Sequence, residues 1–402
     1  MHTSWKKTFT IIYTGQAFSL LGSAAVQFSL IWWLTVRTES AITLALASTV
    51  SFLPSLLLGP FAGVWVDRYN RRTVMIAADL FIALSSVALG VLFLITDAPP
   101  IWCLYLALFA RGLGGTFHSP AMQAAIPMLV PAEMLTKAGG WGSLISSLSN
   151  MLGPVLGAAL MGLFSMTSIM LVDVFGAAFA VICLLFVAIP DVPGRTEKVR
   201  VLADLRQGLR TMRGNRALMA MFLPLILVNL LSTPISSLFP LLVRTQYLGE
   251  AYHNSVVEMV FAGGVLASSA AMGIWGGMKK RFLMASLAIA VLGLSCAAGG
   301  ALPAAGFWGF VLCCFLMGGS ATFINVPLVA YVQETTAPEQ MGKVMSLLMT
   351  AMTLSMPFGL LVAGPLSELI GVNRWFFWSG LVLAGLALLF FARTRRHDPQ
   401  KA

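Results

Sequence analysis

The sequence of 402 residues contains little charge and long stretches with none. Only 10% of its residues are charged, against roughly 25% in an average soluble domain, while 58% are hydrophobic. A run of about 20 apolar residues crosses a bilayer as a helix, because only a helix satisfies its own backbone polar groups there. The composition therefore excludes a soluble domain. A net charge of +10 would suggest nucleic-acid binding in a soluble protein. In a membrane protein the positions of the basic residues indicate orientation instead, so nucleic acid is not an expected partner.

Cysteine and histidine are scarce too, with five and four residues. All five cysteines fall inside apolar runs without metal-ligand spacing, which predicts packing residues rather than disulfides or a zinc site. The sequence shows no nucleophile–base pair, and it has no Gly-x-x-x-x-Gly-Lys-Ser/Thr nucleotide motif. These absences argue against an enzyme, against a bound cofactor and against a pump that hydrolyses ATP.

Twelve apolar runs predict an all-α polytopic membrane protein with twelve transmembrane helices. The polar stretch 190–216 separates the first six runs from the last six and predicts a cytoplasmic linker between two domains, 1–189 and 217–402. Within it, residues 199–212 suit a helix on the inner membrane surface or a solvated linker. The runs lie at residues 9–36, 43–66, 74–96, 101–129, 139–164, 168–189, 217–243, 255–277, 282–301, 307–332, 342–369 and 372–391.

Lysine and arginine lie mostly on one side of the predicted membrane. If the amino terminus is cytoplasmic, 21 of the 25 lysine and arginine residues fall on the cytoplasmic side. The other four are Arg37, Arg244 and Arg374, which lie outside, and Arg111, which lies within a helix. Since cytoplasmic loops carry the excess of basic residues, both termini are predicted to be cytoplasmic. The protein itself is predicted to lie in the plasma membrane.

The two halves contain similar segments. Phe117 to Pro120, followed by Pro131, matches Phe323 to Pro327, followed by Pro338. In both halves the two prolines are about eleven residues apart, and a glycine-rich stretch precedes them. This internal similarity predicts two six-helix halves related by pseudo-symmetry.

Three motifs carry a resemblance to a known family. The first joins the second and third runs and consists of Gly63-Val-Trp-Val-Asp67-Arg68-Tyr-Asn-Arg71-Arg72. The second is Arg111-Gly-Leu-Gly114, and the third runs from Gly140 through Gly153-Pro154-Val-Leu-Gly157. With these motifs the chain resembles the major facilitator superfamily over nearly its whole length. Stretches such as Thr14-Gly-Gln-Ala-Phe-Ser-Leu and Gly371-Val-Asn-Arg-Trp-Phe resemble its macrolide efflux branch of drug:proton antiporters.

The resemblance implies a major facilitator fold and the export of an amphipathic, macrolide-like drug in exchange for protons, by alternating access. It implies that the protein works as a monomer, with or without other efflux components. It also implies that Asp67 gates the cytoplasmic side by meeting helix eleven near Gly342 and Lys343. Arg68, Arg71 and Arg72 anchor the topology in any case. Alternatives are export of a siderophore-like metabolite, import of a nutrient, and a non-transporting membrane sensor.

Asn70 departs from the first motif, which usually has glycine there. Asparagine tolerates a positive φ, so Asn70 can adopt the conformation that glycine would supply.

Arg111 is predicted to lie near the bilayer centre, about 15 Å into a helix that begins near Ile101. A guanidinium there is usually turned into the helix bundle and paired. The depth and the family motif favour a role in tuning a proton site or substrate cavity, with structural pairing as the alternative.

Four acids lie within a few residues of a predicted span end. Glu258 is the first candidate for carrying the coupled proton and Asp173 the second, since both would enter the membrane from outside. Asp79 enters from the cytoplasmic side and is expected to pair with an arginine, although it remains a proton-coupling candidate. Glu368 is expected to be interfacial. Intramembrane acids also serve as structural partners, which is the alternative for each.

A polar stripe on helix one is the leading candidate for a cavity lining, with interhelical hydrogen bonding as an equal alternative. His118 lies on one helix face with Arg111 and Met122, where it either lines the cavity or bonds between helices. In helix five, Asn150 belongs to a polar and glycine-rich face for which close packing is favoured, with Pro154 as a bend point. The helix-one stripe comprises Gln16, Ser19, Ser23 and Gln27.

Overall fold

The computed structural model describes residues 4–96, 98–131, 134–187, 189, 209–211, 213–336 and 338–394. The chain forms two compact units. The first comprises Met1–Leu34 and Thr49–Val199, and the second comprises Thr35–Ser48 and Arg200–Ala402. Most of the predicted linker, including most of its surface helix, lies outside the described residues.

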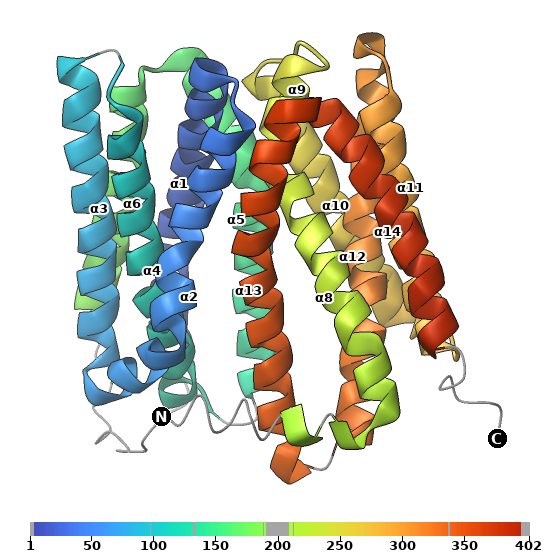
Figure 1. The fold of residues 1–402 in the computed structure, drawn as a ribbon. Coiled ribbons are helices and arrows are strands. Elements are labelled where there is room, and N and C mark those ends of the chain that lie inside the picture. Colours follow the sequence, from blue (N-terminus) through green and yellow to red (C-terminus); the bar gives the residue numbers. More distant parts are fainter. Residues whose placement is uncertain are drawn as a thin grey trace. The chain divides into compact units, whose positions relative to one another are not determined.

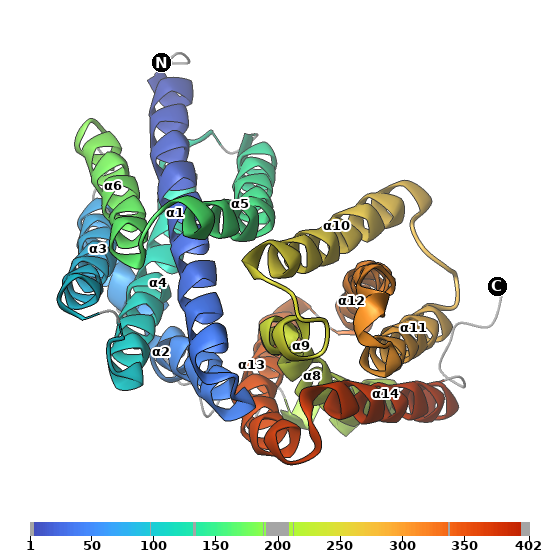
Figure 2. The ribbon, with the colours of Figure 1, turned by 90° about the horizontal axis from the view of Figure 1, so that it is seen from above.

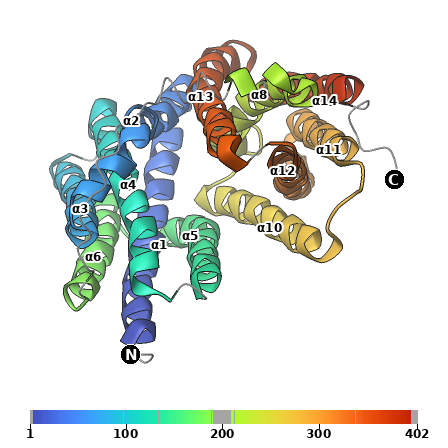
Figure 3. The same ribbon diagram turned by 90° about the horizontal axis from the view of Figure 1, so that it is seen from below.

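In the first unit the described residues form six long helices. Figure 1 labels them α1 to α6. Helix α3 packs against α4 and α6. Seen along the helices, α1 lies between α6 on one side and α5 on the other (Figures 2 and 3). The helices are α1 (Ser4–Thr38), α2 (Ala41–Arg68), α3 (Arg71–Ile95), α4 (Ile101–Leu129), α5 (Leu135–Leu163) and α6 (Met166–Leu185).

The second unit is also helical over the residues that the structure describes. In it, α11 packs against α12 and α14, and α10 packs against α12. Its elements are α8 (Arg216–Ser237), α9 (Phe239–Thr245), α10 (Ala251–Trp275), α11 (Arg281–Ala301), the 3₁₀ turn η2 (Ala304–Gly306), α12 (Phe307–Thr335), α13 (Pro338–Ile370) and α14 (Val372–Thr394).

Among the described residues, eleven helices are long and apolar enough to cross a membrane. The remaining long helix is α4, which has 29 residues and contains Arg111 and His118. Both side chains are buried, each about 9% exposed. The fourth predicted span is therefore a helix of full length whose interior carries the polar residues that lower its hydropathy.

The seventh predicted span is wrong as one continuous helix. The structure divides residues 217–243 into α8 and α9, which meet at Leu238. Pro240 lies in the first turn of α9. Because proline has no backbone N–H and its ring crowds the preceding turn, an unbroken helix through Pro240 would lose a hydrogen bond. The sequence contained this signal within an otherwise apolar run.

The turn between α2 and α3 corrects the expectation for Asn70. This residue has φ −61° and ψ 121°, an extended conformation rather than one with positive φ. Its side chain accepts hydrogen bonds from the backbone N–H groups of Arg72 and Thr73, at 2.9 and 3.4 Å. Asn70 is thus the N-cap of α3, a role that asparagine performs well and glycine performs without side-chain contacts.

Close contact between α1 and α5 depends on glycines of the third motif. A Cβ atom on Gly157 would lie 2.7 Å from the Ala25 carbonyl oxygen and 2.9 Å from Cδ1 of Phe28. Gly153 likewise lies against Ala24. Small residues at such positions let helix backbones approach closely inside a membrane, so the predicted packing role of this motif agrees with the contacts seen.

We expect Gly157→Ala to lower the thermal unfolding temperature of the purified protein, because overpacking typically costs about 1–3 kcal/mol. The matched control is Gly162→Ala in the same helix, where no atom lies within 4 Å of an added Cβ. Alanine forms helices better than glycine, so the control should keep or raise stability. Equal unfolding temperatures for the two variants would contradict the close packing of Gly157 against α1.

Candidate functional site

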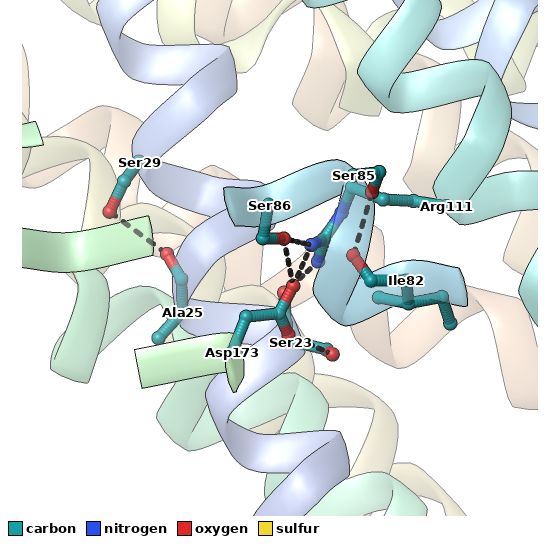
Figure 4. Close-up of polar contacts among 8 residues, drawn as sticks. All are labelled: Ser23, Ala25, Ser29, Ile82, Ser85, Ser86, Arg111 and Asp173. Atoms are coloured by element: carbon teal, nitrogen blue, oxygen red, sulfur yellow. Dashed lines mark hydrogen bonds and ion pairs between the residues drawn. The ribbon is translucent and has the colours of Figure 1, made fainter. Parts of the chain in front are cut away.

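A buried ion pair joins four helices of the first unit. Arg111 of α4 donates to a carboxylate oxygen of Asp173 in α6, and both side chains are buried. Asp173 also accepts hydrogen bonds from the hydroxyls of Ser23 in α1 and Ser86 in α3, at 2.5 and 2.6 Å (Figure 4). Arg111 donates further to the Ser86 hydroxyl and the Ser23 carbonyl, at 3.1 and 2.9 Å.

These contacts match the structural pairing that was the alternative for Arg111. One guanidinium and two hydroxyl groups donate to this carboxylate, and a paired charge avoids most of the cost of isolated burial. Ser86 is the member of this cluster that sequence reasoning missed. The geometry therefore accounts for Asp173 and Arg111 as a four-helix tie, and their proton-coupling role stays a prediction.

A second polar group lies around Asp79 in α3. Gln16 of α1 donates from Nε2 to Oδ2 of Asp79 at 3.4 Å, and Nε2 of His118 lies 3.6 Å from Oδ1. All three side chains are buried. The expected arginine partner of Asp79 is replaced, among the described residues, by a glutamine and a titratable histidine. The carboxylate is consequently held less tightly than Asp173.

The two polar groups share one spacing. Gln16 and Ser23 are seven residues apart in α1, Asp79 and Ser86 are seven apart in α3, and Arg111 and His118 are seven apart in α4. Seven residues make about two helical turns, or roughly 10 Å. Three helices thus contribute one residue each to a layer around Asp79 and one each to a layer around Asp173. This repeated spacing was visible in the sequence and would have identified Ser86.

A cavity of about 450 Å³ borders the Asp79 layer between α1, α4 and α5. Three of the predicted cavity residues line it, namely Gln16, His118 and Met122. Tyr13 and Gln123 also line it and were missed. The cavity combines aromatic, thioether and amide groups, which suits an amphipathic ligand.

The other predicted cavity residues are not among those that line this space. Ser23 belongs to the Asp173 layer, and Ser19 is buried. Gln27 is partly buried, and Asn150 is exposed on α5. The helix-one stripe therefore divides between the two alternatives, since Gln16 both lines a cavity and makes an interhelical bond, whereas Ser23 makes only interhelical bonds.

Glu258 lies in the second unit, on the second turn of α10. Its Oε1 atom accepts a hydrogen bond of 2.8 Å from Nδ2 of Asn254, one turn earlier. Glu258 is partly exposed, whereas Asn254 is fully buried. No cation is recorded beside Glu258 among the described residues, so its surroundings differ from those of Asp173.

The charged loop has a structural role at the end of α6. Arg71 is buried, and Nη2 of Arg72 donates to the Leu185 carbonyl at 3.0 Å. Leu185 is the last residue of α6, where a cation offsets the unpaired carbonyl groups. The side chains of Asp67, Gly342 and Lys343 lie outside the described residues, so the predicted gate between them remains a prediction.

A strap of the second unit, Thr35–Ser48, connects α1 to α2. Glu39 of the strap accepts a hydrogen bond of 3.1 Å from Nε of Arg244 in α9. Glu368 of α13 accepts from the Ala41 backbone N–H at 2.8 Å and from the Ser40 hydroxyl at 3.2 Å. The Glu368 carboxylate thus lies at the first turn of α2, where the helix dipole stabilises a negative charge. The expected interfacial position of Glu368 fits its exposure.

Comparisons with known proteins identify the family. The model of the Major Facilitator Superfamily matches residues 12–282 and 245–402. "Macrolide efflux protein A" of Streptococcus pyogenes is 36% identical over 390 residues, which cover 96% of each chain. The protein of the same name from Enterococcus faecalis is 36% identical over 323 residues, covering 80% of this chain and 99% of that one.

A solved structure agrees with these sequences. A bacterial homologue of the human lysosomal transporter Spinster, in an inward-facing and unoccupied conformation, matches with a TM-score of 0.77. The match covers 100% of this chain and 99% of that chain at 12% identity, and so concerns the fold. The chain belongs to the Major Facilitator Superfamily and is a multi-pass membrane transporter. The predicted twelve-helix fold and the resemblance to the macrolide efflux branch are confirmed.

We expect Asp173→Asn to destabilise the protein by about 3–5 kcal/mol, because it leaves the Arg111 guanidinium buried without its counter-ion. The double variant Arg111→Met with Asp173→Leu removes both charges and should recover much of this loss. Thermal unfolding in detergent measures both effects.

The control for this prediction is an exposed pair. Arg281 donates two hydrogen bonds of 2.6 Å to Glu334, which is largely exposed. Glu334→Gln should leave the unfolding temperature nearly unchanged, because solvent screens this pair. If Asp173→Asn were as mild as Glu334→Gln, the ion pair would not be the tie described here.

Proposed function

We propose that the protein exports amphipathic, macrolide-like molecules in exchange for protons, by alternating access, with both termini in the cytoplasm. Support comes from the name and coverage of the macrolide efflux relatives and from the unequal distribution of lysine and arginine. The observation that carries the proposal is the Asp79 group, a buried carboxylate beside a histidine at the wall of a 450 Å³ cavity.

The Asp79 group suits proton exchange for a simple electrostatic reason. A carboxylate in an apolar setting gains or loses a proton according to its access to water and to nearby cations. When Asp79 is ionised, it attracts a cationic amphipathic substrate to the cavity. When Asp79 takes up a proton, that attraction ends and the substrate leaves. Nε2 of His118 lies 3.6 Å from Oδ1 of Asp79, close enough for the imidazole to share the exchanged proton.

Asp173 and Glu258 have different parts in this scheme. Asp173 pairs with Arg111 and holds α1, α3, α4 and α6 together around the exchanging layer. Glu258, the first candidate from the sequence, lacks such a cation among the described residues and stays a candidate proton carrier in the other unit. A proton driven by 100 mV gains about 2.3 kcal/mol, which supports a concentration gradient of substrate.

Alternating access would strain the two points where α1 and α2 enter the strap. The strap belongs to the second unit, while most of α1 and α2 belongs to the first. When one unit moves, α1 and α2 must bend at these points, or the strap must leave its contacts with Glu368 and Arg244 and follow the first unit. We propose that these contacts release in each cycle.

The function is tested with inverted membrane vesicles. An inside-acid gradient should drive uptake of a radiolabelled macrolide, and Asp79→Asn should abolish this uptake while leaving downhill substrate exchange intact. Glu334→Gln also replaces one carboxylate by an amide, but at an exposed site, and this variant should transport normally. If vesicles with wild-type protein took up no macrolide under the gradient, drug export would be rejected, and a siderophore-like substrate would be assayed in the same vesicles.

The same vesicles compare the two proton carriers. Glu258→Gln should also abolish uphill uptake and spare exchange if Glu258 carries a proton. Uphill uptake that remains intact in Glu258→Gln assigns the coupling to Asp79 alone, and the reverse result assigns it to Glu258.

The strap is tested by a disulfide. A Cβ atom on Gly364 would lie 3.0 Å from Cβ of Ala45, so the two backbones need to separate by only about 0.5–1 Å to reach the spacing of a disulfide. The double variant Ala45→Cys with Gly364→Cys should lose nearly all transport on oxidation and recover it with dithiothreitol. Each single cysteine variant serves as the control. Full transport by a completely cross-linked protein would show that the strap does not release.

A further inference from the structure

A groove of about 560 Å³ lies between α1 and α5, separate from the cavity beside Asp79. Its aromatic lining includes Trp5, Phe9 and Tyr13 of α1 and Trp141 of α5. Transport as proposed above does not use this groove. Aromatic side chains line the groove along its length, and basic groups lie at one end. Such a lining suits an amphipathic molecule and is not typical of a gap in packing.

The charges around the groove all have the same sign. Lys6 of α1 and Lys137 of α5 line it, both are exposed, and no residue of the lining is acidic. Nζ of Lys6 lies 5.9 Å from the centre of the Trp5 ring. Each lysine is the third residue of its helix, where the helix dipole adds further positive potential. This end of the groove therefore attracts an anion.

The apolar part of the groove has the length of one membrane leaflet. From Lys6 to Phe18 the lining follows α1 for twelve residues, or about 18 Å. One leaflet contributes roughly 15 Å of hydrocarbon. Phe18 is 58% exposed and packs edge-on against Phe179 of α6, so the groove ends in a hydrocarbon-like surface.

We propose that this groove binds an anionic phospholipid, with its phosphate headgroup between Lys6 and Lys137 and an acyl chain along α1 toward Phe18. The phosphate would bind between two cations at the end of the groove, and the acyl chain would pack against aromatic side chains along its length. Basic pockets between transmembrane helices bind acidic headgroups in this way. A cationic drug would meet the wrong charge here, which distinguishes the groove from the Asp79 cavity.

The bound lipid would touch the wall of the cavity. Tyr13 and Ile145 line both the groove and the cavity. The Tyr13 hydroxyl lies 3.0 Å from the position of a Cβ on Gly142, so this wall is closely packed. Lipid in the groove therefore supports the side of Tyr13 that faces away from the cavity.

The test uses purified full-length protein in detergent, with phosphatidylglycerol and phosphatidylcholine of identical acyl chains. Retained lipid is counted by native mass spectrometry, and the rise in unfolding temperature gives a second measure of binding. Wild type should bind phosphatidylglycerol at least tenfold more tightly than phosphatidylcholine. The variant Lys6→Gln with Lys137→Gln should lose this preference.

The matched control is Lys279→Gln with Lys280→Gln, which removes two exposed lysines from the turn between α10 and α11. This control should keep the wild-type preference. Equal losses in the two double variants would show unspecific attraction and overturn the proposal, as would an unchanged preference in Lys6→Gln with Lys137→Gln.

Two competitors identify the occupant. Glycerol phosphate should not displace the lipid at equal concentration, because it lacks the acyl chains. Displacement by glycerol phosphate would instead assign the groove to a soluble anion, and displacement by a macrolide would assign it to the substrate. Both outcomes contradict a lipid site. Since binding is measured without transport, failure of the drug-export proposal would leave this result unaffected.

Discussion

The need to pair one guanidinium inside the membrane determines the arrangement of the first unit. Arg111 lies near the middle of α4, where an unpaired charge would be costly. Its counter-ion comes from α6, and the hydroxyls that complete the site come from α1 and α3. Four of the six helices must therefore keep a fixed height relative to one another. A second, smaller polar group lies within this frame.

The Asp79 layer is that small group, two helical turns from the ion pair. Both layers draw on α1, α3 and α4, yet they differ in what faces the carboxylate. A guanidinium holds the charge of Asp173, whereas an amide and an imidazole contact Asp79. Asp173 is therefore paired with a permanent cation, whereas Asp79 faces two groups that carry no fixed charge. This difference in partners is why the proposed proton exchange is placed at Asp79.

Much of the fold could be predicted because membrane helices obey a simple length rule. The apolar runs gave the elements, and the motifs gave the family. The break at Leu238 was missed because Pro240 sits in an apolar run, and hydropathy does not report the lost N–H donor. Asn70 was placed in the right turn, but its conformation depended on a cap that the sequence alone did not distinguish from a positive φ.

The site was predicted less completely because pairing partners come from distant parts of the chain. Sequence analysis selected Arg111, Asp173, Asp79 and His118 one by one as polar residues in apolar surroundings. It could not decide which of them meet, since that depends on the relative heights of the helices. The common spacing of seven residues in α1, α3 and α4 held this information. Glu39 and Glu368 in the strap carried no comparable pattern, because neither lies on a regular polar face.

The pairing of Arg111 also constrains how the chain is made. Arg111 is synthesised 62 residues before Asp173. At about 5–20 residues per second, the ribosome needs roughly 3 to 12 seconds to produce that partner. During this interval α4 carries a charge whose partner has not yet been made. The cost of burying the Arg111 charge is therefore offset only after α6 has been made and the two helices have met.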